Sequence, residues 1–225
     1  MYRIGTFDGA RLPRLAGGRR GRPVLDAARL FDILAAAALI AFLAPVMILV
    51  ALGVKAQDGG PVAFGQLRIG RDGRPFRCLK FRSMVIDAED RLGGLLASDA
   101  QAREEWAVYR KLRRDPRITP LGAFLRKSSL DELPQLFNVL RGEMSLVGPR
   151  PIVPSEAPLY GRWLRHYKAV RPGITGLWQV SGRNHTSYRR RVALDVLYAR
   201  RRGFALDLMI LLKTVPAVLL TEGSY

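Results

Sequence analysis

Residues 33–54 include no charged side chain, and no other feature of the sequence restricts the fold as strongly. A straight α-helix of this length spans about 33 Å, which is enough to cross the hydrocarbon core of a membrane. The run is longer than the apolar part of a usual secretory signal, and a long arm precedes it. It is also apolar on every face, which disfavours a buried core helix. The sequence therefore predicts a membrane segment.

Pro45 lies near the middle of this run. Proline removes a backbone donor and clashes with the preceding turn, so we expect the helix to kink or break there into halves that each reach about 17 Å. Basic residues flank both ends of the run, and the positive-inside bias therefore places both ends in the cytoplasm. These residues are Arg19, Arg20, Arg22 and Arg29 before it and Lys55, Arg68, Arg71 and Arg74 after it. A re-entrant helix hinged at Pro45 fits both observations, and a straight span remains the alternative.

The chain of 225 residues carries a formal net charge of +18, which implies an anionic partner: nucleic acid, an acidic membrane surface or a phosphorylated substrate. We interpret residues 1–25 as a flexible basic arm on anionic headgroups, with a solvated tail as the alternative. Residues 26–56 form the re-entrant helix and residues 57–225 a cytosolic domain. The single cysteine, Cys78, excludes an internal disulfide and leaves too few ligands for a structural zinc site.

For the cytosolic part, the sequence predicts an α+β fold that is mainly helical with short strands. A strand hairpin is expected from residues 62–69 and 76–81, around the turn at 71–74. Helices are expected over 86–112 with an interruption near Gly93 and Gly94, over 118–126, 134–140 and 160–170, and a short strand over 145–147. The helix over 134–140 should bury Leu133, Leu136, Phe137 and Leu140. Residues 189–220 alternate arginine clusters with apolar runs and predict a pair of interfacial amphipathic helices, although residues 206–212 fit burial against the domain as well.

Two adjacent acids, Asp131 and Glu132, lie between a cationic lead-in at Arg126 and Lys127 and the segment 148–151, which contains Arg150. An adjacent Asp-Glu pair can share one Mg²⁺ ion, which commonly binds one or two carboxylates together with substrate phosphate oxygens. Arginines supply permanently charged, planar donors for the remaining oxygens. The pattern indicates phosphate chemistry. Residues 129–132 also fit an S-x-x-E capping box, in which Ser129 and Glu132 would cap a helix.

Three segments, 80–84, 125–151 and 171–184, resemble the bacterial sugar transferase family, and the likeness runs from about Asp26 to Thr214. Members of this family are monotopic polyprenyl-phosphate phosphoglycosyl transferases at the cytoplasmic face of the bacterial inner membrane. The resemblance implies a re-entrant membrane helix hinged at a proline. Some members have Ser-Pro at this hinge, whereas this chain has Ala44 before Pro45.

The resemblance also implies site residues. It carries over Lys80 as a site residue at a strand end, Arg150 as an arginine near the bound phosphate, and Arg183 as an active-site arginine. Asp195 and Asp207 match family acids, of which Asp195 is the better candidate; either could instead pair locally with arginines.

The implied reaction transfers a sugar 1-phosphate from a UDP-sugar to undecaprenyl phosphate and releases UMP. Our hypothesis is that Asp131 attacks phosphorus to form an aspartyl phosphosugar, which the lipid phosphate then displaces, while Glu132 holds Mg²⁺. A divalent ion and Arg126 would keep Asp131 ionised, and Arg150, Arg183 and Lys80 would offset charge on the transferring group.

The sugar is suggested by segments 104–106 and 177–183, which are similar to exopolysaccharide-initiating members that transfer galactose or glucose 1-phosphate; we favour UDP-galactose. Nucleic acid is not expected as a partner, because a nucleic-acid-binding role would explain the positive charge but not the membrane segment. A non-enzymatic basic membrane scaffold is the alternative from another class, and a homodimer remains open.

Overall fold

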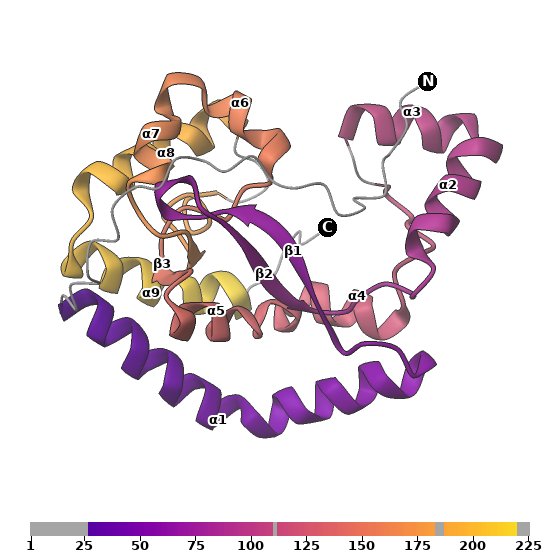
Figure 1. Ribbon diagram of the computed structural model, residues 1–225, viewed down its shortest axis with the longest axis horizontal. Coiled ribbons are helices and arrows are strands. Elements are labelled where there is room, and N and C mark those ends of the chain that lie inside the picture. Colours follow the sequence, from indigo (N-terminus) through magenta and orange to yellow (C-terminus); the bar gives the residue numbers. More distant parts are fainter. Residues whose placement is uncertain (1–26, 110–111, 183–186, 220–225) are drawn as a thin grey trace.

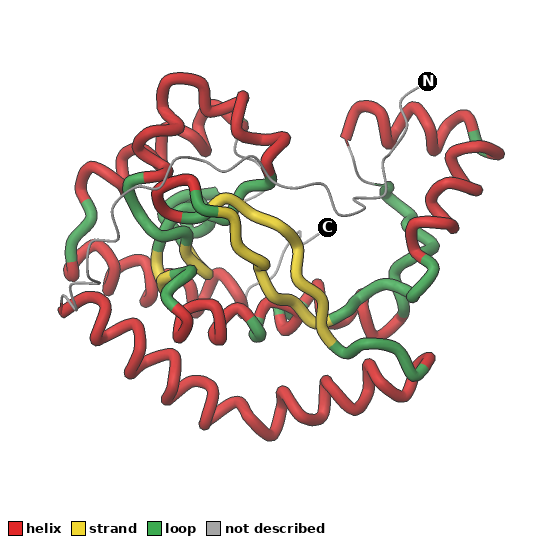
Figure 2. Tube along the Cα trace, in the orientation of Figure 1, coloured by secondary structure: helices red, strands yellow, loops and turns green. Residues whose placement is uncertain are grey.

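The computed structural model describes residues 27–109, 112–182 and 187–219. The described chain is mainly helical with two small sheets, so the predicted α+β class is confirmed. The basic arm expected over residues 1–25 lies outside the described residues. Figures 1 and 2 show the α-helices α1 (Ala27–Asp58), α2 (Ala88–Ser98), α3 (Ala100–Tyr109), α4 (Pro120–Lys127), α5 (Gln135–Arg141), α6 (Ala157–Tyr160), α7 (Leu164–Lys168), α8 (Tyr188–Arg201) and α9 (Phe204–Leu219). The strands are β1 (Ala63–Ile69), β2 (Pro75–Phe81), β3 (Ser145–Val147) and β4 (Gly173–Thr175), and the short 3₁₀ turns are η1 (Arg71–Gly73), η2 (Leu130–Glu132), η3 (Pro154–Glu156) and η4 (Gly161–Trp163).

Helix α1 contains the apolar run and continues through Pro45 without a break. Figure 1 shows it as an arc whose middle lies farthest from the other elements. A bend is the expected effect of a proline that removes one backbone hydrogen bond. The outward side chains are exposed, Phe42 by 79%. Within the described residues, α1 is the one helix long and apolar enough to cross a membrane.

Both ends of α1 are bound to the rest of the chain. Near its N-terminus, the Arg29 guanidinium donates to the carbonyl oxygen of Val139 at 2.7 Å, and Asp32 Oδ1 accepts from the Leu146 amide at 3.0 Å. At its C-terminus, Arg82 donates to the Asp58 carboxylate and, at 3.3 Å, to the Val54 carbonyl. Side chains at the start of α1 therefore bind the backbone of the domain, and the Arg82 side chain of the domain binds the end of α1.

The hairpin of β1 and β2 forms as predicted, with Phe64 opposite Lys80 and Arg68 opposite Phe76. At its turn Asp72 and Gly73 adopt positive φ values of 59° and 76°. Residues opposite each other in an antiparallel pair share one face of the sheet, and side chains alternate along each strand. Arg68 on β1 and Lys80 on β2 consequently lie on the same face.

Strands β3 and β4 form a short parallel pair that begins a close backbone approach. A Cβ on Gly148 would lie 2.4 Å from the Arg171 carbonyl oxygen, so only glycine fits there. The Gly148 amide donates to the Thr175 carbonyl at 2.9 Å. This contact fixes the start of the loop that carries Arg150.

Among the described residues, the buried side chains form three clusters. One joins α1, β2, α5, β3, α8 and α9, the second joins α1, β2 and α4, and the third surrounds Tyr160 and Tyr167 between α6, α7 and α8. The turn with Asp131 and Glu132 connects α4 in the second cluster with α5 in the first. Packing on both sides therefore determines the position of the acid pair.

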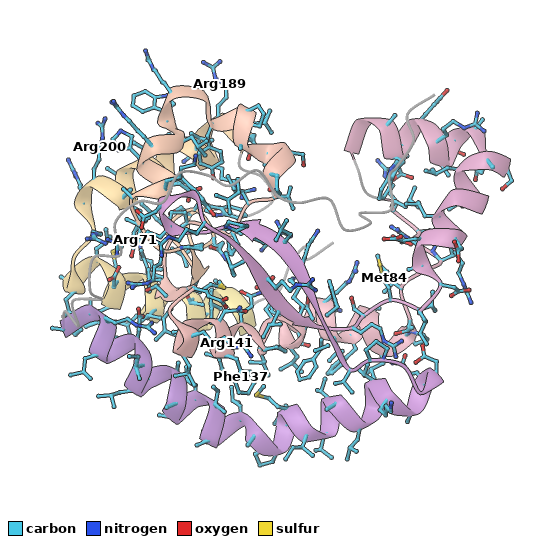
Figure 3. All side chains as sticks on the ribbon, viewed as in Figure 1. Arg71, Met84, Phe137, Arg141, Arg189 and Arg200 are labelled. Carbon is cyan, nitrogen blue, oxygen red and sulfur yellow. The ribbon has the colours of Figure 1, made fainter. Side chains whose placement is uncertain are left out.

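Two expectations about helices are wrong. The interruption in the helical segment falls at Asp99 and not at Gly93 and Gly94, because Asp99 Oδ1 accepts from the Ala102 amide at 3.0 Å and caps α3. On α5, Phe137 and Leu140 are exposed, and Phe137 points into the space between α5 and α1 (Figure 3). Leu136 is buried as predicted, while the polar Asn138 takes an inward position because it bonds to β2.

The predicted C-terminal helix pair exists as α8 and α9, but the two helices lie at different distances from α1. Figure 3 shows Arg189 and Arg200 of α8 pointing away on the side opposite α1. Helix α9 lies beside the start of α1, where Phe204 and Phe31 make an edge-on ring contact at 5.8 Å. Its Ile210 is fully buried while Leu212 is exposed by 65%, so α9 packs one face on the domain and leaves an apolar face open.

Candidate active site

The acid pair lies in the 3₁₀ turn η2, between α4 and α5. Ser129 adopts a left-handed conformation with φ 59°, which ends α4, and its amide donates to the Arg126 carbonyl at 3.2 Å. Its hydroxyl makes no capping hydrogen bond, so the alternative of an S-x-x-E capping box is wrong. An N-cap residue normally has extended torsions, which Ser129 does not have. Asp131 and Glu132 are thereby left without a capping role.

Lys80, at the end of β2, binds both acids. Its ammonium group lies 3.1 Å from Asp131 Oδ2 and 2.7 Å from Glu132 Oε1. All three side chains are largely buried, with Asp131 only 6% exposed as a residue. The structure therefore brings together Lys80, Asp131 and Glu132, which the sequence predicted as site residues.

Arg150 adds a second cation to the pair. Its Nη2 lies 3.5 Å from Glu132 Oε1, the same oxygen that accepts from Lys80. Arg68, on β1, donates to the Pro151 carbonyl at 3.0 Å and so stabilises the loop that carries Arg150. A depression that is open to solvent is lined here by Arg68, Cys78, Lys80, Glu132, Gln135, Arg150, Pro151 and Ile174.

The two acids have different electrostatic environments. Burial raises the pKa of Asp131, and repulsion from Glu132 adds to this, although Lys80 and Arg126 oppose it. Burial also acts to raise the pKa of Glu132, but the charges of Arg150, Lys80 and Arg68 outweigh it and hold that pKa below its ordinary value. Arg126 itself donates from Nε to Ser83 Oγ at 2.8 Å and acts on Asp131 through its charge. In the protein alone, Glu132 is the more readily ionised acid.

Asp195 lies outside this group. It is 1% exposed in the third cluster, where its Oδ2 accepts from the Tyr160 hydroxyl at 2.6 Å. Burial raises the pKa of Asp195 to about 6, against the opposing effects of Tyr160 and Arg191. Arg191 lies 3.5 Å from Glu156, and Glu156 lies 3.8 Å from Arg68 of the depression, so Asp195 faces the site only through intervening residues. Asp207 accepts from the Tyr198 hydroxyl at 2.9 Å, away from the acid pair.

Two further predicted residues are placed as follows. Arg183 falls outside the described residues. Pro45 lies near the middle of α1, which Figure 1 shows as an arc.

The acid pair fits a magnesium ion that shares its ligands with a substrate. Among the residues that the structure describes, no group of three or more His, Cys, Asp or Glu side chains is arranged to hold a metal. Mg²⁺ retains several waters and often binds only one or two carboxylates with substrate phosphates, whereas zinc sites need three or four protein ligands. Two carboxylates beside an open, cationic depression meet the first requirement and not the second.

The sequence reading missed Arg68, Gln135 and Glu156 as neighbours of the site. Arg68 was noted only as a flanking charge. Its signal was present in the hairpin, because a turn at 71–74 pairs Arg68 with Phe76 and so places it on the face of Lys80. Gln135 follows Glu132 by only three residues, at the start of α5, so its signal was local. Glu156 carries no comparable signal, since tertiary packing alone brings it there.

Comparison with known proteins gives consistent matches along most of the chain. Residues 25–221 match the bacterial sugar transferase family. The chain is 50% identical over 199 residues to the exopolysaccharide production protein ExoY of Rhizobium meliloti, covering 88% of each protein. It is 49% identical over 197 residues to an undecaprenyl-phosphate galactose phosphotransferase of Salmonella typhimurium, covering 88% of this chain and 41% of that one. It is also 41% identical to a UDP-glucose:undecaprenyl-phosphate glucose-1-phosphate transferase of Caulobacter vibrioides, covering 96% of this chain and 76% of that one.

Proposed function

The chain belongs to the bacterial sugar transferase family, and from this premise we propose that it transfers a sugar 1-phosphate from a UDP-sugar to undecaprenyl phosphate and releases UMP. The names of the galactose and glucose transferases support UDP-galactose or UDP-glucose as the donor. Similarity to ExoY supports a role in starting exopolysaccharide synthesis.

The observation that carries the proposal is the meeting of Asp131 and Glu132 with Lys80 and Arg150 beside an open depression. A diphosphate brings negative charge that needs cationic donors, and transfer of its sugar-bearing phosphoryl group needs a nucleophile. The cluster offers both, and its charged groups are positioned before the substrate arrives.

The reaction proceeds in two displacements. An Asp131 carboxylate oxygen attacks the sugar-bearing phosphorus, the bond from that phosphorus to the bridging oxygen breaks, and UMP leaves with the electron pair. An oxygen of undecaprenyl phosphate then attacks the same phosphorus, and the bond to the Asp131 oxygen breaks to restore the carboxylate. Lys80 and Arg150 neutralise the phosphoryl oxygens in both steps. Splitting the transfer avoids bringing two polyanions together at once.

Magnesium is the implied cofactor. Glu132, with Asp131 beside it, would hold the ion, which when bound neutralises phosphate charge and favours the ionised form of Asp131.

We also propose that α1 is re-entrant and fixes the site at the cytoplasmic face of the inner membrane. Arg29 ties the start of α1, and Arg82 its end, to one body. A helix across the membrane would hold these ends on opposite sides of a core about 30 Å thick, where one domain on one side cannot bind both. The basic flanks at both ends favour the same side. The exposed faces of α1 and α9 would contact lipid.

The anchored position explains how a soluble domain reaches a lipid substrate. The phosphate of the carrier stays in the headgroup layer, and pulling an isoprenoid chain into water costs about 0.8 kcal/mol for each exposed CH₂ group. A site at that depth needs no such extraction.

The test is UMP release by the full chain in lipid nanodiscs that contain undecaprenyl phosphate, with a panel of UDP-sugars. We expect release with UDP-galactose or UDP-glucose and its loss on chelation of divalent ions. Release of more than one UMP per enzyme molecule without carrier lipid would contradict the proposal. No release with any UDP-sugar would favour a scaffold role.

A further inference from the structure

Lys80 occupies the place between the two carboxylates. Its ammonium group contacts one oxygen of Asp131 and one of Glu132, at 3.1 and 2.7 Å. A divalent cation shared by an adjacent acid pair would use oxygens of the same two groups. Lysine and metal are therefore competitors for one position.

The charges in direct contact with the acids are already balanced, and Arg68 and Arg126 add positive charge from farther away. Asp131 and Glu132, when both are ionised, carry two negative charges, and Lys80 and Arg150 carry two positive ones within 3.5 Å. Adding a divalent cation to this largely buried group would leave an uncompensated double positive charge, which a low-dielectric surrounding strongly disfavours. A diphosphate that arrives with the metal would supply the missing negative charge.

We propose that Lys80 is a placeholder cation that keeps divalent metal out of the acid pair until a nucleoside diphosphate enters. The phosphate oxygens then take over the Lys80 ammonium, and the freed carboxylates bind the metal. The inference deepens the proposed function and rests on it for the identity of the diphosphate. Metal and nucleotide consequently bind with positive coupling, which by linkage is the same in both directions.

The architecture suits such a move. The backbone of Lys80 is fixed by pairing with Phe64 in the hairpin, while the four-carbon side chain can swing its compact charge without moving the strand. Arg150 lies at the rim with a half-exposed side chain and can contact the same phosphate. While Lys80 lies between the two acids, it also keeps Asp131 Oδ2 in a hydrogen bond until substrate is present.

The experiment measures Mn²⁺ binding to the full chain in nanodiscs by the loss of the free-ion electron paramagnetic resonance signal, with and without UDP. Chelation by UDP is corrected with protein-free titrations. For wild type we expect weak binding without UDP and tightening of about 10-fold or more with it, within the range usual for coupled sites. For Lys80→Met we expect binding without UDP to tighten by about 10-fold and the further effect of UDP to fall below about 3-fold.

Three variants separate charge from general damage. Lys80→Arg keeps a cation and should retain the weak metal binding of wild type, whereas Lys127→Met, at the exposed end of α4, should leave both values unchanged. Glu132→Gln combined with Lys80→Met should lose the tightened binding, which locates it at the acid pair. Metal binding by Lys80→Met that is as weak as in wild type, or UDP coupling that persists undiminished in it, would overturn the inference.

UMP release by wild type is recorded in parallel. If UMP is released but the coupling is absent, the placeholder role fails alone. If Lys80→Met tightens metal binding and wild type releases no UMP, the placeholder role stands and the proposed function fails.

Discussion

Asn138 ties the strand that carries Lys80 to the helix that follows the acid pair, and we expect Asn138→Ala to destabilise the protein strongly. The side chain is fully buried. Its Oδ1 accepts from the Leu79 amide at 2.9 Å, and its Nδ2 donates to the Arg77 carbonyl at 2.8 Å and to Glu143 Oε2 at 2.6 Å. The amide thus acts as a one-residue strand on the edge of β2 that β1 leaves open.

The magnitude follows from these three bonds. Alanine removes all of them and leaves a backbone donor and a backbone acceptor of β2 without that partner, at about 1–3 kcal/mol for each unsatisfied group. Water can reach the part-buried bonds, so we expect a total loss of about 3–5 kcal/mol. For a protein of this size the melting temperature should fall by roughly 6–20 °C.

The assay is thermal unfolding in nanodiscs, followed by tryptophan fluorescence. Glu143→Gln is the matched control, because it keeps an acceptor for Asn138 and removes only its charge, with an expected loss of about 1 kcal/mol. UMP release by Asn138→Ala should be slower than in wild type even at temperatures where the variant is still folded, since the position of Lys80 is then less well fixed. A fall of less than about 2 °C for Asn138→Ala would refute the reasoning, because the edge of β2 would then be satisfied without this amide.

Three other predictions test the mechanism, the buried acid and the topology. Asp131→Asn should lower UMP release by at least about 10³-fold and prevent trapping of a radiolabelled phosphosugar adduct, and undiminished adduct would remove Asp131 as the nucleophile. Because the folded pKa of Asp195 is raised to about 6, its protonated form is favoured in the native state; its contribution to stability is present at low pH and is lost as pH rises towards 6. The free energy of unfolding of Asp195→Asn relative to wild type should therefore increase between pH 4 and 7, by up to about 3 kcal/mol, and its relative melting temperature should increase with it. A difference between the two proteins that does not change with pH would contradict the assignment. Cysteines introduced as Ala27→Cys and Gln57→Cys should both react with impermeant maleimide only from the cytoplasmic side, over a low background because burial raises the pKa of the Cys78 thiol to about 11; labelling of either from the periplasm would exclude the re-entrant helix.

Local patterns in the sequence were sufficient for the elements around the site. The hairpin, α4, α5 and β3 were expected from strand alternation and helical composition, and Gly142 ends α5 with φ 83°. Asp131 and Glu132 were found as adjacent acids among cationic residues, whereas Lys80 was assigned to the site through the family resemblance. A local signal was overlooked at Asp99, whose carboxylate accepts from the Ala102 amide, caps α3 and places the break there instead of at two glycines.

Burial was the least predictable property. Phe137 and Leu140 are apolar and were assigned to the core, yet both are exposed, Phe137 towards α1, while Asn138 between them is buried. Binary patterns assume that apolar side chains face inward, and a domain that lies on lipid has a second apolar environment. The same reason separates the C-terminal pair, since α9 adjoins α1 and Arg189 and Arg200 of α8 point away from it.

The asymmetry between the two acids supports the assignment of their roles. Glu132 Oε1 is contacted by both Lys80 and Arg150, and these charges lower its pKa. A carboxylate whose electron pairs are engaged by two cations is a good anchor for charge and a poor nucleophile. Among the described residues, Asp131 has one such ion pair, with Lys80. Burial raises the pKa of Asp131, so its carboxylate is the more basic of the two and the better nucleophile once ionised. An incoming phosphate that draws the Lys80 ammonium away would leave Asp131 without its ion pair with Lys80, whereas Glu132 would still have Arg150 beside it.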